Sequence, residues 1–230
     1  MEKGDGAREE SFRVMPYTFE SWRQRLAERS DVSTSITHLT RGPDGKEADP
    51  DAALEVLLKI IVDKKIRGST TASGFICGNR PAVCFQEAPP QFLAQNVYFE
   101  KKYRKVDIAA KVRYLGFGLI FNKTYAFKKG CRPVIYDRTS DAKEYLPKVE
   151  WWRIVNLNLD ADDKLVDWTH EREWRCPDNF RFERNRATIL LPNKSAYRRF
   201  VERSREIETA DGHDLLAEIR GFIDMHALLY

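Results

Sequence analysis

The stretch RYLGFGLIF, residues 113–121, is a strongly β-prone run of aromatic and branched side chains. Such side chains favour the pleated, partly buried backbone of a sheet, so we expect a strand here. NKTYAFKKG at 122–130 has the length of a short helix that ends at Gly130, because glycine suits the C-terminal cap of a helix. RPVIY at 132–136 then predicts a further strand.

Upstream of this run, the sequence predicts a strand, a helix and a second strand. SITHLT at 35–40 alternates apolar and polar residues, as a half-buried strand does. Asp49 and Pro50 form a helix start, with Asp as the cap and Pro in the first helical position. The helix then carries an apolar stripe with helical spacing, made of Leu54, Leu57, Leu58, Ile61 and Val62. PAVCFQ at 81–86 predicts a short buried strand.

Further strand and helix signals lie on both sides of this run. Before it, we expect a short amphipathic N-terminal helix at 18–30, a loop at 41–51 and a helix after the second strand at 88–96. After it, we expect helical character at 141–159, interrupted by Pro147, then strands at 167–175, 179–183 and 187–192, and helices at 194–208 and 213–229. Strands do not alternate regularly with long helices, which argues against a doubly wound parallel sheet. The sequence therefore predicts an α+β fold: one domain over residues 18–230, with a central mixed β-sheet and surrounding helices, after a flexible N-terminus at 1–17.

The composition is that of a globular protein and excludes several function classes. The chain has 230 residues, of which 42% are hydrophobic and 32% charged, with a formal net charge of +4. It has no apolar signal segment and no apolar run long enough to span a bilayer, so we expect a cytoplasmic protein without a membrane partner. Its four cysteines form no C-x-x-C pair, so we expect reduced thiols and no metal site. Dinucleotide-fold, P-loop, zincin and α/β-hydrolase motifs are absent from the sequence.

The segment WTHEREWR at 168–175 is the most informative for function. As a strand, it would place Glu171 and Glu173 on one face, roughly 6.6 Å apart between Cα atoms. Two carboxylates this close repel each other, and the pKa of at least one rises unless a cation compensates. The pair indicates either a functional site or an exposed edge strand whose glutamates pair with neighbouring arginines.

Other candidates are a histidine, a polar pair and one charged stretch. Gln86 and Glu87 follow a buried apolar run directly, which indicates either the rim of a site or an exit turn. His38 shares a predicted strand face with Thr40, so its imidazole could face a cleft or serve a structural role. Residues 172–205 hold ten Lys and Arg against four acids, a balance of +6. This stretch indicates either a surface for nucleic acid or a solvated helix face.

Motif order brings two resemblances. SITHLT, the helix that ends LLKIIVDKKIRGS and the strand AVCFQEAP together resemble the opening of the ADP-ribosyltransferase fold, especially its DarT-like group. The order GLIFNK…GCRPVIY, then HEREWR, then TILLP, resembles the AbiG (AbiGi-like) family of abortive phage resistance. The similarity covers roughly residues 35–192.

The resemblance implies an ADP-ribosyltransferase-like fold with NAD as substrate. Glu173 would hydrogen-bond the nicotinamide ribose, and Glu171 would orient or deprotonate the acceptor. His38 and Thr40 would hold the other parts of NAD, and Phe85 could stack on the nicotinamide. The tyrosine expected in such a site has no clear match; Tyr98, Tyr103 and Tyr125 are candidates.

Three functions compete at this point. The first is an NAD-dependent transferase that acts as an effector in phage defence or in a toxin–antitoxin pair, with nucleic acid or protein as acceptor. The second is a non-catalytic, antitoxin-like binding protein, whose partner would be another protein of the defence operon or nucleic acid bound through 172–205. The third is a hydrolase that uses Glu171 and Glu173 as an acid/base pair.

Overall fold

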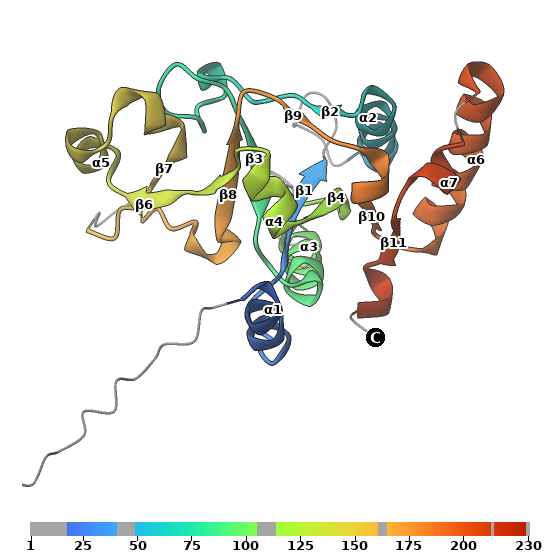
Figure 1. Ribbon diagram of the computed structural model, residues 1–230, viewed down its shortest axis with the longest axis horizontal. Coiled ribbons are helices and arrows are strands. Elements are labelled where there is room, and N and C mark those ends of the chain that lie inside the picture. Colours follow the sequence, from blue (N-terminus) through green and yellow to red (C-terminus); the bar gives the residue numbers. More distant parts are fainter. Residues whose placement is uncertain (1–17, 41–48, 105–113, 161–164, 213, 229–230) are drawn as a thin grey trace, which may run out of the picture.

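A seven-stranded β-sheet forms the centre of the computed structural model, which describes residues 18–40, 49–104, 114–160, 165–212 and 214–228 (Figure 1). The strand order is β11-β10-β4-β1-β3-β8-β5, and only β10 and β11 run parallel to each other. The strands are β1 (Ser35–Thr40), β3 (Ala82–Gln86), β4 (Phe117–Asn122), β5 (Arg132–Pro133), β8 (Glu173–Pro177), β10 (Thr188–Leu191) and β11 (Gly221–Asp224). The prediction of an α+β fold around a central mixed sheet is confirmed.

Helices surround this sheet, and two small two-stranded sheets flank it. The α-helices are α1 (Phe19–Ala27), α2 (Pro50–Asp63), α3 (Pro90–Arg104), α4 (Lys123–Lys128), α5 (Thr139–Tyr145), α6 (Lys194–Asp211) and α7 (Leu215–Glu218). The small sheets pair β2 (Lys65–Ile66) with β9 (Phe180–Arg181) and β6 (Ile135–Asp137) with β7 (Ile154–Asn156). Short 3₁₀ turns are η1 (Thr71–Ser73), η2 (Lys148–Arg153), η3 (Thr169–Glu171), η4 (Arg184–Arg186) and η5 (His226–Leu228).

One side of the sheet, the apolar face, packs against α2, α4, α6 and α7. It carries Ile36, Phe85 and Leu119, which are at most 1% exposed. Helix α2 forms as its sequence predicts, because the side chain of Asp49 accepts hydrogen bonds from two backbone N–H groups of the first turn. The helices contribute the rest of this core, including Leu54, Leu57, Leu58, Ile61, Ala126, Phe200 and Leu215.

The opposite side of the sheet, the polar face, is covered by two different units. Helix α3 packs a small apolar cluster against one part of it, made of Leu93, Ala94, Val97, Tyr114, Ile120, Leu190 and Met225. At the other part, Trp152 of η2 packs with Ile76 and Ala82. Polar side chains fill the region between these units.

Most predicted elements are present, and three differ. The helical character expected at 141–159 ends before Ile154–Asn156, which forms strand β7 paired with β6. The segment 167–175 is a strand only from Glu173, because Trp168–Arg172 makes a turn in which Arg172 has a φ of 44°. The helix expected at 213–229 is instead a short helix, strand β11 and a 3₁₀ turn. Strand β11 forms because Phe222 and Ile223, adjacent in sequence, pack on opposite faces of the sheet. Residues 1–17 and 41–48, the expected flexible N-terminus and most of the expected loop, lie outside the described residues.

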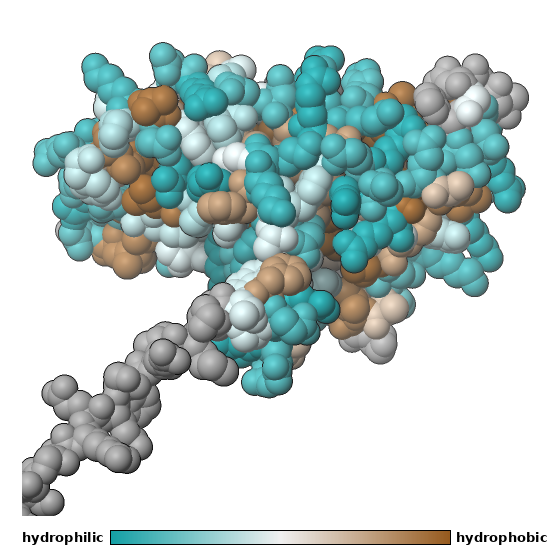
Figure 2. All heavy atoms as spheres, in the orientation of Figure 1, coloured by the Kyte–Doolittle hydropathy of each residue, from teal (hydrophilic) through white to brown (hydrophobic). Residues whose placement is uncertain are grey.

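Hydrophilic side chains dominate the face of the molecule seen in Figure 2, and hydrophobic residues gather there only in small, separate patches. Within the described ranges, each helix is too short or too polar to cross a membrane.

Candidate functional site

The register of three central strands builds a row of polar side chains on the polar face. Thr37 of β1 lies opposite Gln86 of β3, and Gln86 lies opposite Glu173 of β8. Directly opposed residues of antiparallel strands point to the same side of the sheet. All three side chains are at least nine-tenths buried, with exposed fractions of 2%, 7% and 6%. Burial of polar groups is costly, so this row needs a physical explanation.

A buried ion pair anchors one end of the row. Arg175, two residues after Glu173 on the same face, donates from Nε to Glu173 Oε1 at 2.7 Å. Its other nitrogens donate to the backbone oxygens of Phe75, Trp152 and Ile154. Burial alone would lower the pKa of Arg175. The negative charge of Glu173 raises it by more, so the pKa of Arg175 is higher than its ordinary value. Arg175 therefore fixes the Glu173 carboxylate and ties η2 and β7 to the sheet.

Glu171 reaches the same region from the turn η3. Its carboxylate accepts a hydrogen bond from the hydroxyl of Tyr114, which is 7% exposed. Burial, together with the Glu171 charge and hydrogen bond, raises the pKa of Tyr114 well above its usual value. The structure thus brings Glu171 and Glu173 to one side of the sheet, although only Glu173 belongs to a strand.

The charges of both glutamates also affect two further groups, Tyr136 and Cys84. Tyr136 accepts a hydrogen bond from the backbone N–H of Glu173 at 2.7 Å. Burial and the charges of Glu173 and Glu171 raise the pKa of Tyr136 to about 12. Burial and the same two carboxylates also raise the pKa of Cys84.

Gln86, in the middle of the row, has an unmet hydrogen-bonding group. Its Oε1 atom is buried and has no hydrogen-bond partner among the described residues. A buried acceptor without a partner costs about 1–3 kcal/mol. A ligand that donates an N–H or O–H to this oxygen would remove that cost. Gln86 is therefore the group in the cluster that most directly points to a ligand.

The structure does not bring His38, Thr40 and Phe85 to the glutamates. They lie on the apolar face, opposite to Glu173. Thr40 is 2% exposed and donates a hydrogen bond to the carbonyl of Ala53 in α2. Phe85 is 1% exposed and packs edge-on against Phe121 and Phe180.

His38 has a clear role in the sheet. Its Nδ1 atom hydrogen-bonds the carbonyl of Cys84 at 2.9 Å, and its ring lies edge-on to Phe85. The ladder between β1 and β3 has only one residue pair, Thr37 with Gln86. The imidazole therefore adds a side-chain link between two strands that share little backbone pairing.

The basic stretch 172–205 is partly neutralised by its surroundings. At least five of its ten basic side chains form ion pairs with described residues: Arg172, Arg175, Arg184, Arg199 and Arg203. Several of the acidic partners lie outside the stretch, namely Asp31, Asp51, Glu55, Glu206 and Glu218. A charge sum over consecutive residues therefore overstates the positive charge of this surface.

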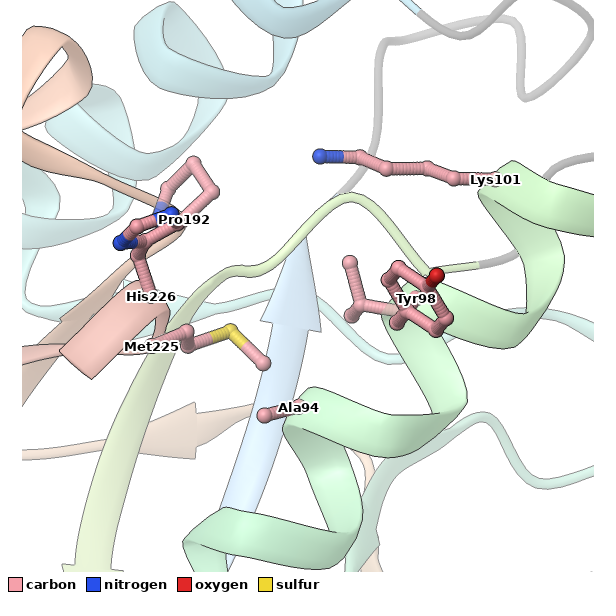
Figure 3. A pocket seen from close by; sticks show the side chains of 7 residues that line it. Ala94, Tyr98, Lys101, Pro192, Met225 and His226 are labelled. Atoms are coloured by element: carbon pink, nitrogen blue, oxygen red, sulfur yellow. The ribbon is translucent and has the colours of Figure 1, made fainter. Parts of the chain in front are cut away.

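A hollow lies beside α3, near β10 and β11. It has a volume of about 120 Å³ and is lined by Ala94, Val97, Tyr98, Lys101, Pro192, Met225 and His226. In Figure 3 the amine of Lys101 extends from α3 over the hollow, on the side of Pro192. Farther along α3, Phe99 and Tyr103 are 65% and 52% exposed, and their rings stack 6.1 Å apart. This end of α3 thus presents aromatic rings together with lysines.

Sequence reasoning found the two glutamates and marked the polar pair of Gln86 and Glu87. It also offered a pairing of the glutamates with neighbouring arginines, which the structure shows for Glu173 and Arg175. It missed Tyr114, which no pattern in the sequence distinguishes from its neighbours. Of the tyrosines considered earlier, Tyr98 lines the hollow beside α3, Tyr103 is exposed on α3, and Tyr125 hydrogen-bonds Glu183. Only knowledge of the strand register shows that Gln86 faces Glu173.

Comparisons with protein-family models, with curated proteins and with solved structures found no match to this chain. A search of the described residues for groups of three or more potential metal ligands also found none.

Proposed function

We propose that this protein is an NAD-dependent ADP-ribosyltransferase-like effector of anti-phage defence. The observation that carries the proposal is the convergence of Glu171 and Glu173 with the unpartnered amide oxygen of Gln86 on one side of the sheet. The segments that resemble the transferase fold also supply neighbouring strands, since β1, β3 and β8 are adjacent. The defence role rests on the motif order shared with the AbiG family.

The site can supply what the transfer reaction needs. The bond between nicotinamide and the anomeric carbon of the ribose breaks, and its electron pair leaves with nicotinamide. Positive charge develops on the anomeric carbon, and a fixed carboxylate in a water-poor site stabilises it. An acceptor nucleophile then bonds to the anomeric carbon and gives up a proton to a nearby base.

The two carboxylates suit different parts of this reaction. Arg175 holds Glu173 in one orientation, which is what stabilisation of a developing charge requires. Glu171 is half-buried on a turn, so its carboxylate is the more accessible of the two for an acceptor. Gln86 Oε1 can accept a hydrogen bond from the carboxamide of nicotinamide. In this assignment Gln86 and Tyr114 hold NAD, and His38, Thr40 and Phe85 support the sheet beneath them.

The acceptor could approach over α3. Exposed aromatic rings beside lysines are suited to unpaired bases and phosphates, because rings stack on bases and ammonium groups attract phosphates. This surface is an alternative to residues 172–205 for a nucleic-acid acceptor. The end of α3 also lies close to the site, since the Glu100 carboxylate accepts a hydrogen bond from the backbone N–H of Tyr114.

Release of nicotinamide from NAD by the purified chain tests the proposal. We expect turnover in the wild type, and a loss of at least about 100-fold in Glu173→Gln and in Glu171→Gln. Glu171→Gln keeps the experiment informative if the loss of the ion pair to Arg175 unfolds the first variant. Glu202→Gln, which changes an exposed carboxylate on α6, is the matched control and should retain turnover.

The non-catalytic function is the alternative outcome of the same experiment. No binding of NAD at millimolar concentration by the folded protein would overturn the transferase proposal. The antitoxin-like function would then predict a stable complex with another protein of the defence operon.

A further inference from the structure

Cys131 and Cys176 lie opposite each other at the edge of the central sheet. Strands β5 and β8 are antiparallel, with Arg132 opposite Arg175 and Pro133 opposite Trp174. Continued by one residue, this register places Cys131 opposite Cys176. Both side chains point to the apolar face, where both belong to its buried core.

The position of the pair in the ladder brings the sulfur atoms close together. The N–H of Val134 donates to the carbonyl of Glu173 at 3.0 Å, so these two residues form a hydrogen-bonded pair. Along an antiparallel ladder, hydrogen-bonded and non-hydrogen-bonded pairs alternate. The pair Cys131 and Cys176 lies three residues from the pair Val134 and Glu173, so it is a non-hydrogen-bonded pair. Cα atoms in such pairs are about 4.5 Å apart, within the span of roughly 4.4–6.8 Å that disulfides bridge.

Each thiol shifts the pKa of the other. The neighbouring Cys131 thiol lowers the pKa of Cys176, and the Cys176 thiol raises the pKa of Cys131. Cys176 Sγ lies 3.6 Å from the carbonyl oxygen of Lys129. The remaining cysteines, Cys77 and Cys84, lie elsewhere and are half-buried.

We propose that Cys131 and Cys176 are a redox-active pair, which oxidation converts to a disulfide between β8 and the start of β5. The inference does not depend on the proposed transferase activity. With a low-molecular-weight disulfide as oxidant, the Cys176 thiolate attacks one of its sulfurs and releases one thiolate. Cys131 then attacks Cys176 Sγ and releases the second thiolate. The protein loses two electrons and two protons, and two molecules of the low-molecular-weight thiol form.

The fold gives the oxidant a way in, although both thiols are buried in the closed structure, with exposed fractions of 0% and 2%. Strand β5 is two residues long and lies at the sheet edge. Short edge strands open locally at a lower free-energy cost than the core. Gly130, directly before Cys131, has a φ of 97°, and no atom lies within 4 Å of a Cβ placed on it. This side of the turn therefore makes no close contact with the rest of the described residues. The disulfide would fasten the segment around β5, where the N–H of Val134 donates to the carbonyl of Glu173.

Peptide mapping of the full-length protein tests the pair directly. The folded protein is equilibrated with oxidised glutathione or with a reducing agent, free thiols are alkylated in denaturant, and trypsin digestion follows. We expect GCRPVIYDR (130–138) linked to CPDNFR (176–181), two hydrogen atoms lighter than the sum of the separate peptides, in at least half of the oxidised molecules. Cys77 and Cys84 should remain alkylated in both samples.

Cys77→Ser is the matched control and should leave the linked peptide unchanged. Cys131→Ser should abolish it, and Cys176→Ala provides the same test if Cys131→Ser does not fold. The proposal is overturned if the oxidised, folded wild type carries glutathione on single cysteines, links other cysteines, or keeps all four thiols free.

Discussion

The two faces of the central sheet are built from the same strands but differ in what they bury. On the apolar face, Phe85, Phe121 and Leu119 pack under α2 and need no partner besides each other. On the polar face, Gln86, Glu173 and Arg175 are equally buried, and one acceptor stays unpaired. The comparison teaches that the apolar face stabilises the fold. The polar face instead buries polar groups at a cost in free energy, which suggests that these groups serve a purpose other than stability.

The largest effect should follow from a cavity on the apolar face. Phe85→Ala removes a fully buried ring that contacts Phe121 and Phe180. We expect a loss of about 4 kcal/mol in the free energy of unfolding, measured by urea denaturation. A loss below about 1 kcal/mol would show that Phe85 is not a core residue and would reopen its role as a ligand contact.

The polar face should respond next, through its buried ion pair. Arg175→Met leaves the Glu173 carboxylate buried without a counter-charge, at a cost of about 3 kcal/mol. The double variant Arg175→Met with Glu173→Gln should recover part of that loss, because no uncompensated charge remains. Equal losses in the single and double variants, compared by urea denaturation, would contradict the account of this pair.

An exposed ion pair gives the contrasting case. Arg203 on α6 pairs with Glu55 at 2.8 Å and with Glu206, but these side chains are 42–61% exposed. We expect Arg203→Ala to change the free energy of unfolding by only about 0.5 kcal/mol. A loss of free energy of unfolding well above about 1 kcal/mol, measured by urea denaturation, would mean that α6 depends on surface charge more than on its apolar contacts.

The smallest expected effect is a change of slope with pH. The pKa of Tyr136 is raised to about 12 in the folded state, above its ordinary value near 10 in an unfolded chain. The folded state therefore holds this proton where the unfolded state has lost it, and stability falls as pH rises from about 10 to 12. In Tyr136→Phe this fall should be shallower, as measured by urea denaturation across that range. An unchanged slope would show that Tyr136 titrates alike in both states.

How much the sequence predicts differs between the faces. Apolar periodicity correctly predicted α2 and the central strands, because the spacing of Leu54, Leu57 and Leu58 directly encodes a buried helix face. The pair Glu171 and Glu173 was found because two carboxylates so close in sequence repel each other. Gln86 was marked only as part of a site rim or an exit turn, and Tyr114 and Tyr136 were not found, because all three meet the glutamates only through strand register and tertiary packing. The turn at Arg172 was missed because alternation of residue types continues through it.

Nicotinamide release by Gln86→Leu and His38→Leu tests the central claim most directly. The two residues lie on neighbouring strands, on opposite faces, and receive the same replacement. The account predicts that Gln86→Leu stays folded and loses NAD turnover, because it removes a buried acceptor that has no partner among the described residues and that is proposed to bind NAD. His38→Leu should retain turnover while it is folded. Turnover retained in Gln86→Leu and lost in folded His38→Leu would contradict the account and place the site on the other face.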